Sequence, residues 1–321
     1  MPPASTLKQK GLLLVAVICV VFLFVGGPDL VDSRSFKHTW DLGHIAAFAV
    51  WALLLIGNWP WLAAASFGQQ AVVVLLCCFA VGGSVEVVQG LCGRYPAWGD
   101  MGRNAVGCLL ALFFLFPKRA FVNRRRRRIF QAATLGLLLI TLIPVARALV
   151  DEWAARRDFP VLADFETPFE RDRWSGHTGL TIDHTLAHSG RASLRMDLNT
   201  DKYSGPALRY FPGNWLGWAW ISFSVFNPDT EPVRLTCKIH DHRHDVSGYR
   251  YHDRFNRSYL IQEGWNRIRV PLKDVEDAPS GRKMDLKQIT GFHLFAVSLP
   301  APRTLYLDTL TLESGSMGAS R

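Results

Sequence analysis

Three pairs of polar residues interrupt the apolar N-terminal half of this chain at helical spacing. The pairs are Asp41 with His44, Glu86 with Gln89, and Asp100 with Asn104. Residues three or four apart share one face of a helix. Polar side chains within a membrane are costly, so they are candidates for function by default.

The chemistry of these residues suits a charged group at a membrane boundary. Arg94 lies between the second and third pairs and adds a guanidinium, which binds phosphate or carboxylate bidentately. The carboxylates and His44 are able to exchange protons with a bound group. Glu86 is the strongest single candidate because its neighbours in the sequence are valines. The pattern predicts a cluster for headgroup binding or proton transfer; a salt-bridge network that only joins helices is the open alternative.

A second polar set lies in the C-terminal half, between residues 240 and 256. Sugar hydroxyls need donor and acceptor side chains beside an aromatic platform, and this stretch supplies both. The candidate glycan-binding residues are Asp241, His244, Tyr251, Asp253, Arg254 and Asn256. In a strand, His240, His242 and His244 would share a face and suggest zinc. An unbroken polar run is more typical of a loop or of the rim of a binding face.

Five apolar segments must position the first set. They are Gly11–Gly27, a helix from about Gly43, about Gln70–Leu91, Asn104–Phe116 and Ile129–Leu149. A bilayer needs roughly 20 apolar residues per helix. Turn residues at Gly57–Pro60 or Phe67–Gln70 divide the second segment from the third. The first segment has one alternative, a cleaved signal peptide.

The charge distribution predicts the orientation of these helices. The chain has 36 Lys+Arg and 27 Asp+Glu residues, a net charge of +9. Residues 1–150 hold the whole excess, and seven cations lie within Lys118–Arg128. Basic loops stay in the cytoplasm, so the N-terminus is expected inside and residues 151–321 outside. The excess of positive charge therefore reflects the orientation of the helices in the membrane, and no nucleic-acid partner is expected.

The C-terminal half predicts a β-sandwich. Short alternating runs recur between turn residues; they are Ser193–Leu198, Trp220–Phe226, Leu235–Ile239, Arg267–Pro271, Gly291–Val297 and Thr304–Leu312. A single cysteine, Cys237, excludes an internal disulfide in this half. The expected fold is a membrane α-helical bundle of five transmembrane helices followed by an all-β jelly-roll sandwich. The expected boundaries are 1–150 for the helices, 151–158 for a linker, 159–315 for the sandwich and 316–321 for a tail.

The polar residues of the N-terminal half resemble a family signature. The matching residues are Asp41, His44, Phe48, Glu86, Gln89, Arg94, Asp100, Asn104 and Gly107. Their order and spacing resemble VanZ-like membrane proteins over about residues 10–117, with Leu42 where members often carry Lys. The family is named for a protein that gives low-level resistance to teicoplanin, a glycopeptide antibiotic. The resemblance implies the bacterial cytoplasmic membrane and a role at its outer leaflet, near the cell envelope.

The C-terminal half looks like a carbohydrate-binding module with a galactose-binding-like jelly roll. The resemblance rests on Asp164-Phe165-Glu166, Ser189–Leu194, Gly264-Trp265-Asn266 and Leu305–Asp308. Many such domains hold one structural Ca²⁺, and the matching positions here are Glu166 and Asp308. Oxygen ligands suit this hard cation. No cofactor is otherwise required, and ordinary strand-end acids are the alternative interpretation.

Three functions follow from these patterns. The leading one is a non-enzymatic membrane protein that recognises a membrane lipid or lipid-linked cell-wall precursor, with an outer domain that binds an envelope glycan. The second is a membrane enzyme that acts on a lipid phosphate headgroup through Glu86, His44 and Arg94. The third is a scaffold, in which the polar cluster holds the helices together and the sandwich binds a protein.

Overall fold

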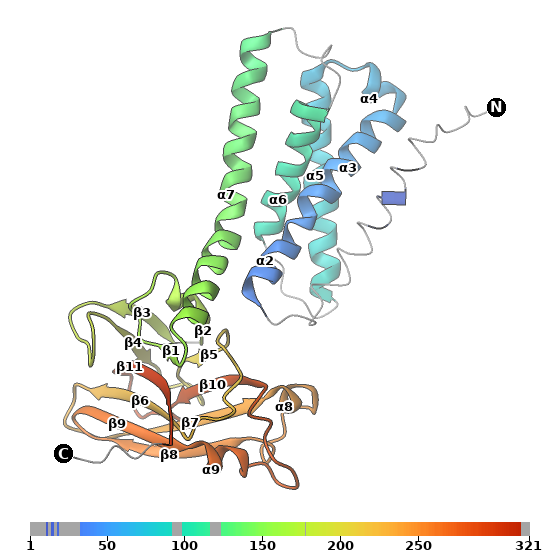
Figure 1. The fold of residues 1–321 in the computed structure, drawn as a ribbon. Helices are drawn as coiled ribbons and strands as arrows, with labels where there is room; N and C mark the ends of the chain where they lie inside the picture. The colour runs from blue at the N-terminus through green and yellow to red at the C-terminus, as the bar shows by residue number, and fades with distance from the viewer. Residues whose placement is uncertain are drawn as a thin grey trace. The chain divides into compact units, whose positions relative to one another are not determined.

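The computed structural model describes residues 11, 14, 15, 18, 33–91, 98–115, 123–176 and 178–315. The chain divides into two compact units, residues 1–146 and 147–321 (Figure 1). The first unit is helical, and the second is a β-sandwich that follows the end of the last long helix. Each unit has its own apolar core.

The helical unit consists of apolar helices separated by short breaks. Its described elements are α2 (Arg34–Asp41), α3 (Gly43–Asn58), α4 (Pro60–Ala64), α5 (Phe67–Leu91), α6 (Trp98–Leu110), η1 (Ala111–Leu115) and α7 (Arg124–Arg157). Ser33 caps α2 by accepting from the N–H of Phe36 at 3.2 Å. Pro60 starts α4 because proline is tolerated in the first turn of a helix. The break expected at residues 57–60 therefore occurs, whereas residues 67–70, the alternative position, already belong to α5 and the second break lies at residues 65–66.

Three helical segments of the described residues are long and apolar enough to cross a membrane: Arg34–Asn58, Phe67–Val88 and Arg124–Arg157. Five transmembrane helices are not confirmed. The expected first span, Gly11–Gly27, lies mostly outside the described residues. The expected fourth span corresponds to α6 and η1, which are not among the three candidates.

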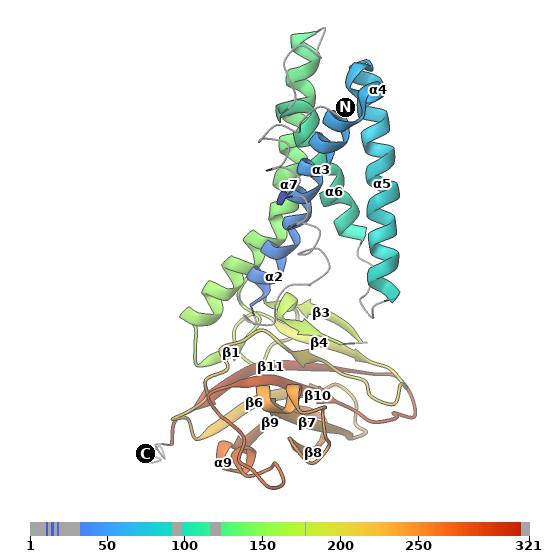
Figure 2. The ribbon, with the colours of Figure 1, turned by 90° about the vertical axis from the view of Figure 1, so that its right-hand side faces the viewer.

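Helices α3, α5 and α6 pack against one another (Figure 2). Their core contains Phe48, Ala52, Val74, Cys108 and Leu112. Gly107 lets α6 approach α3, because a Cβ at this position would overlap the carbonyl oxygen of Ile45. Small residues at such crossings allow the close helix packing that is favourable in membranes.

Helix α7 is a single element of 34 residues, about 51 Å long at 1.5 Å per residue. It continues through the expected linker 151–158 as far as Arg157. Its last turns belong to the second unit, where Asp151 and Arg173 form a buried ion pair at 2.9 Å. The last candidate span thus continues into the second unit as a helix rather than through an irregular connector.

The second unit consists of two antiparallel sheets. Sheet A has the order β3-β4-β11-β6-β9, with β1 beside β11, and sheet B has the order β2-β5-β10-β7-β8. The strands of sheet A are β1 (Val161–Ala163), β3 (Gly179–Asp183), β4 (Ser193–Leu198), β6 (Trp220–Asn227), β9 (Gly264–Pro271) and β11 (Arg303–Glu313). Those of sheet B are β2 (Trp174–Ser175), β5 (Ala207–Leu208), β7 (Val233–Asp241), β8 (Phe255–Ile261) and β10 (Ile289–Phe295).

Alternating apolar residues of the two sheets form one core between them. Phe223 and Leu305 of sheet A and Ile239, Phe292 and Leu294 of sheet B belong to this core, which is the arrangement expected of a sandwich. Each of the six predicted strands coincides with an observed strand to within three residues at either end. Two short helices, α8 (His242–Val246) and α9 (Leu272–Glu276), and five strands, β1, β2, β3, β5 and β8, were not predicted.

Candidate functional sites

The helical unit brings three of the predicted polar residues together. The His44 ring lies between α3 and α6, with Nδ1 at 2.9 Å from Oδ1 of Asn104 and Nε2 at 3.6 Å from Oδ2 of Asp100. All three residues are buried. The hydrogen bond to Asn104 therefore satisfies one nitrogen of the buried imidazole, and Asp100 faces the other.

Arg103 is part of this group, although sequence reasoning did not select it. Its guanidinium forms an ion pair with Asp100 and lies at 3.6 Å from Oδ2 of Asp41. Asp41 is partly exposed, with 37% of its side chain accessible. Arg103 comes three residues after Asp100 on α6, and that spacing was the signal available in the sequence.

The remaining members of the predicted cluster lie on or beyond α5. Glu86 is buried, 8% exposed, one turn after Gly82. A Cβ on Gly82 would lie 2.8 Å from the Asn104 amide, so this face of α5 meets α6. Gln89 belongs to α5, but its side chain is outside the described residues, as is Arg94.

Three of the six candidate glycan residues have internal roles instead. Strand β7 ends at Asp241, so the histidines that follow do not continue along a strand face. Asp241 and His244 are fully buried and cannot contact a ligand at the surface. The Asp241 carboxylate caps α8 by accepting from the N–H of His244 at 3.1 Å.

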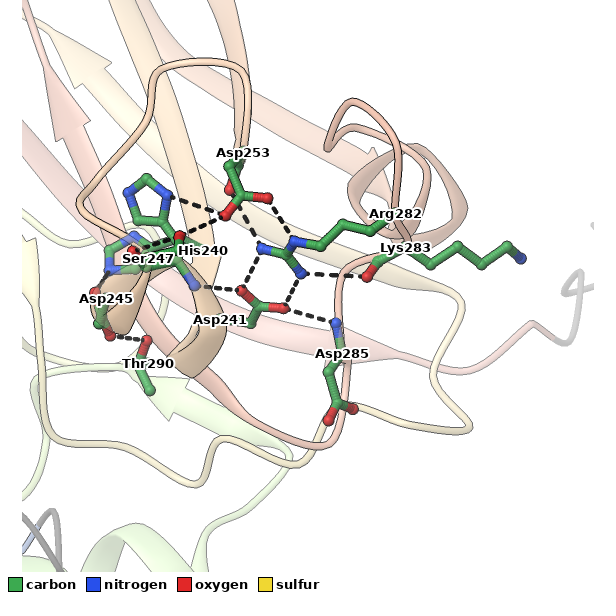
Figure 3. A network of polar contacts seen from close by, with 10 residues as sticks. His240, Asp241, Asp245, Ser247, Asp253, Arg282, Lys283, Asp285 and Thr290 are labelled. Atoms are coloured by element: carbon green, nitrogen blue, oxygen red, sulfur yellow. Dashed lines mark hydrogen bonds and ion pairs between the residues drawn. The ribbon is translucent and has the colours of Figure 1, made fainter.

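Arg282 connects these residues (Figure 3). Its guanidinium donates two hydrogen bonds to Asp241, at 2.6 and 2.8 Å, and forms a further ion pair with Asp253. Burial on its own would raise the pKa of Asp241, but hydrogen bonds from Arg282, Asp285 and His244 hold it below its ordinary value. The contacts of Arg282 with Asp241 and Asp253 therefore hold the loop between β7 and β8 against the segment before β10.

The other three candidates, Tyr251, Arg254 and Asn256, lie toward the outer face of sheet B. We define this face by the side chains of sheet B that point away from the core, namely Thr236, Lys238, His240, Asn256, Ser258, His293 and Phe295, with Arg209 and Arg254 at the strand ends. His293 pairs with Lys238 and Lys238 with Asn256 across three adjacent strands. Cross-strand partners point to the same side of a sheet, which places these three residues in one row.

Gly291 adds a contact that only glycine permits. It pairs with His240 across β10 and β7, and a Cβ there would overlap the imidazole ring. The His240 ring thus lies flat over the strand, and its Nε2 is 3.1 Å from Asp245. Its Nδ1 is buried and has no hydrogen-bond partner among the described residues.

The outer face of sheet B also carries cations that lack carboxylate partners. Lys238 makes no ion pair within the described parts of the chain, and the Arg209 side chain donates there only to the Ser175 hydroxyl, at 2.9 Å. Burial, Arg254 and Arg209 lower the pKa of Lys238 to about 8. Burial, then Lys238 and His240, lower the pKa of His293 to about 3, so this ring is neutral at pH 7. The positive potential of the face is thus concentrated on three side chains.

Aromatic rings flank these cations. Tyr203, 58% exposed, packs edge-on against Phe295 at 5.6 Å between ring centroids. Tyr251, 63% exposed, lies beneath the guanidinium of Arg254 at 5.0 Å. Exposed rings of this kind offer an apolar surface with a polar edge. Trp215, by contrast, is completely buried and serves the core.

The outer face of sheet A presents a second aromatic row. Tyr306, Phe226 and Trp265 are aligned across three strands, and their rings are in contact. The charges beside them are paired, as in the ion pair between Arg195 and Asp197 at 3.0 Å. The rings of this row therefore contact one another, and the Arg195 and Asp197 charges beside them are already paired.

The two predicted calcium ligands hold one loop by hydrogen bonds. Oε1 of Glu166 accepts from the N–H of Ala192 at 2.9 Å, and Oδ2 of Asp308 accepts from the N–H of His188 at 2.7 Å. Burial raises the pKa of Asp308. These N–H groups donate to the carboxylates and so stabilise the ionised form of each carboxyl group. Calcium ligation by Glu166 and Asp308 stays a prediction.

The described residues contain no group of three or more His, Cys, Asp or Glu side chains arranged to hold a metal ion. The His240 and His244 rings do lie close, with centroids 4.9 Å apart. They come from the end of β7 and from α8, so the shared strand face that suggested zinc does not form.

No family model and no curated protein matches this chain. Among solved structures, it is similar to the family 11 carbohydrate-binding module of a cellulosomal cellulase of Clostridium thermocellum, with 17% identity, a TM-score of 0.38, and coverage of 50% of this chain and 96% of the module. An exo-beta-agarase matches with 13% identity and a TM-score of 0.39, over 49% of this chain and 26% of the agarase. The family 30 carbohydrate-binding module of another cellulosomal cellulase of Clostridium thermocellum matches with 14% identity and a TM-score of 0.34, over 45% of this chain and 93% of the module. The VanZ-like resemblance of the helical unit stays a prediction.

Proposed function

We propose that this chain is a membrane-anchored binding protein whose β-sandwich holds a polysaccharide of the cell envelope on the outer face of sheet B. The observation that carries the proposal is the combination on this face of exposed rings with buried polar atoms that have no partner. Tyr203 and Tyr251 supply the exposed rings, and the partly buried Phe295 packs against Tyr203. Nε of Arg254 and Oδ1 of Asn256 are buried and lack hydrogen-bond partners among the described residues.

Unpaired buried polar atoms point to a ligand because leaving them unsatisfied costs about 1–3 kcal/mol each. The Arg254 and Asn256 side chains are themselves only partly buried. Sugar hydroxyls are both donors and acceptors, so one sugar is able to hydrogen-bond to both side chains when they turn toward it. The nearby rings then cover the apolar faces of the sugar. No nucleophile or paired carboxylate is needed for this role.

The helices provide the anchor. Most of α7 between residues 129 and 150 is exposed and apolar, as expected of a lipid-facing helix. Arg124–Arg128 precede the apolar part, and basic residues favour the cytoplasmic side. In this orientation the sandwich after α7 lies outside the cytoplasmic membrane of a bacterium, where envelope polysaccharides are found.

A binding measurement on the full chain in lipid nanodiscs tests the proposal. Insoluble envelope polysaccharides are mixed with the wild type and with the double variant Tyr203→Ala/Phe295→Ala, and the bound protein is quantified. Retention of the wild type and loss of the double variant are expected. The control is Tyr306→Ala on sheet A, whose retention should match the wild type. Failure of the wild type to bind any polysaccharide would overturn the proposal.

A second function, recognition of a lipid headgroup by the helical unit, is favoured by one observation. Glu86 is buried on the face of α5 that meets α6, near the group of His44, Asp100 and Asn104. A buried carboxyl group beside an imidazole and an amide is suited to a polar headgroup or to proton transfer. The VanZ-like resemblance and the enzymatic alternative both depend on this residue.

Glu86→Gln separates these possibilities because it keeps the shape and removes the charge. Mass spectrometry of lipids that co-purify with the intact protein is the measurement. Loss of a specific lipid with unchanged thermal stability supports a headgroup site. Lower stability with unchanged lipids supports the alternative in which the cluster only holds the helices together.

A further inference from the structure

The cations of sheet A differ from those on the outer face of sheet B in their partners. Residues 151–321 contain 22 basic and 22 acidic residues, so no excess charge forces a cation to remain alone. On sheet A, Arg267 and Arg269 both contact Glu313, at 2.8 and 2.6 Å. Lys238, Arg254 and Arg209 form no ion pair with any residue that the structure describes. Exposed cations such as Lys287 and Arg250 also lack a carboxylate partner among the described residues, but the three of sheet B lie together on one face.

The three cations come from different elements but act on one region. Lys238 lies near the centre of the sheet on β7, Arg254 directly precedes β8, and Arg209 directly follows β5. The charges of Arg254 and Arg209 both act on Lys238 and on His293. Lys238 and Arg254 are partly buried, and Arg209 is exposed. Like charges held together on one face repel one another, and a bound anion relieves this repulsion.

The surroundings add one negative charge, that of Asp245, which raises the pKa of Lys238 and partly offsets the effect of the neighbouring cations. Asp245 of α8 faces this region, but its carboxylate is engaged by Nε2 of His240 at 3.1 Å and by the Thr290 hydroxyl at 2.6 Å. Arg254 lies over the face of Tyr251, and its buried Nε has no acceptor among the described residues. An oxyanion is the group that accepts from a guanidinium and neutralises an ammonium at the same time.

We propose that the outer face of sheet B selects an acidic polysaccharide, whose carboxylate, sulfate or phosphate groups are bound by Lys238, Arg254 and Arg209. This inference rests on the proposed function and specifies the class of ligand. The aromatic rings bind the apolar faces of the sugars, and the three cations bind the acidic substituents. A neutral polysaccharide leaves the cations unpaired and binds more weakly.

Matched polysaccharides that differ only in charge test this inference. The full chain in nanodiscs is titrated with polygalacturonate and with its methyl ester, and with dextran sulfate and dextran. Tighter binding of the acidic member of a pair, by about tenfold, and weakening of that binding between 50 and 300 mM salt are expected. The first pair tests carboxylate and the second sulfate; a teichoic acid that carries backbone phosphate tests the third group.

Substitutions connect the effect to the proposed residues. Lys238→Met and Arg254→Met should each weaken acidic polysaccharide binding about tenfold and reduce its salt dependence. Lys287→Met is the matched control, because it removes the same charge from an exposed turn residue of the same unit. Equal binding of charged and neutral members, or equal effects of Lys238→Met and Lys287→Met, would overturn the inference while leaving the proposed function intact. Absence of binding to every polysaccharide would instead refute the proposed function.

Discussion

Arg282→Met is expected to destabilise the sandwich because it leaves Asp241 as an uncompensated buried carboxylate. The Asp241 side chain is 0% exposed and that of Arg282 is 11% exposed, so solvent replaces little of the lost interaction. Methionine keeps most of the aliphatic volume of arginine, and the change therefore removes mainly charge and hydrogen bonds. Breaking a buried pair by removing one partner costs about 3–5 kcal/mol.

The lower end of that range applies here. Asp241 keeps two backbone partners, the N–H groups of Asp285 at 2.9 Å and of His244 at 3.1 Å. Asp253, the other partner of Arg282, is 16% exposed and regains some solvation. We therefore expect the free energy of unfolding to fall by about 3 kcal/mol at pH 7.

The pH dependence follows from the lowered pKa of Asp241. A carboxyl group whose pKa is lower in the folded state stabilises the fold above its unfolded pKa of about 3.9, and loses that contribution as the pH falls through the folded value. In Arg282→Met the buried carboxyl group takes up its proton more easily. The difference from the wild type should therefore narrow between pH 7 and pH 4.

Urea unfolding of the full chain in detergent, followed by tryptophan fluorescence, measures both effects. Arg267→Met is the control, because Arg267 is 62% exposed and its ion pair with Glu313 contributes about 1 kcal/mol or less. The double variant Arg282→Met/Asp241→Asn should be more stable than Arg282→Met, since it removes the buried charge. A loss below 0.5 kcal/mol in Arg282→Met, or no recovery in the double variant, would refute this reasoning.

Three further predictions concern other parts of the chain. His293, whose pKa is about 3 when folded and about 6.5 when unfolded, takes up its proton first in the unfolded chain; the free energy of unfolding should thus fall by up to ~1.4 kcal/mol per unit as the pH drops below 6.5. His293→Gln should reduce this slope in urea titrations between pH 7.5 and 5.0, whereas His184→Gln, at an exposed position, should not. Gly107→Ala should destabilise the helical unit by about 1–3 kcal/mol, because the methyl group overlaps the Ile45 carbonyl, and Gly136→Ala, with no atom within 4 Å, should leave the melting temperature in detergent unchanged. Glu166→Gln should lower the melting temperature through weaker hydrogen bonds to Arg191 and Ala192; a rise in the wild-type melting temperature on adding calcium would show instead that the carboxylate serves a cation.

Much of the fold could be predicted because its signals are local. Alternation along Ser193–Leu198 and Trp220–Phe226 identified β4 and β6, and apolar runs identified α3, α5 and the centre of α7. The short strands β2 and β5 have two residues each, too few for any periodicity to show. The continuation of α7 through residues 151–157 was missed because charged residues there suggested a connector.

The candidate site was only partly predictable, for a physical reason. Tyr251, Arg254 and Asn256 could be identified because polar and aromatic residues follow one another closely in this stretch of sequence. Lys238 and His293 are 55 residues apart, and they meet only because β10 pairs with β7 in a particular register. That register is set by core residues such as Ile239 and Phe292, so no local pattern near Lys238 reveals its neighbour.

Side-chain footprinting by hydroxyl radicals on the full chain in nanodiscs tests the central claim most directly. Saturation with the tightest-binding polysaccharide should protect Tyr203, Tyr251 and Phe295, which lie at the outer face of sheet B. Tyr306 and Trp265, on the outer face of sheet A, should react at unchanged rates. Protection of Tyr306 and Trp265 with unchanged reactivity of Tyr203 and Tyr251 would contradict the account.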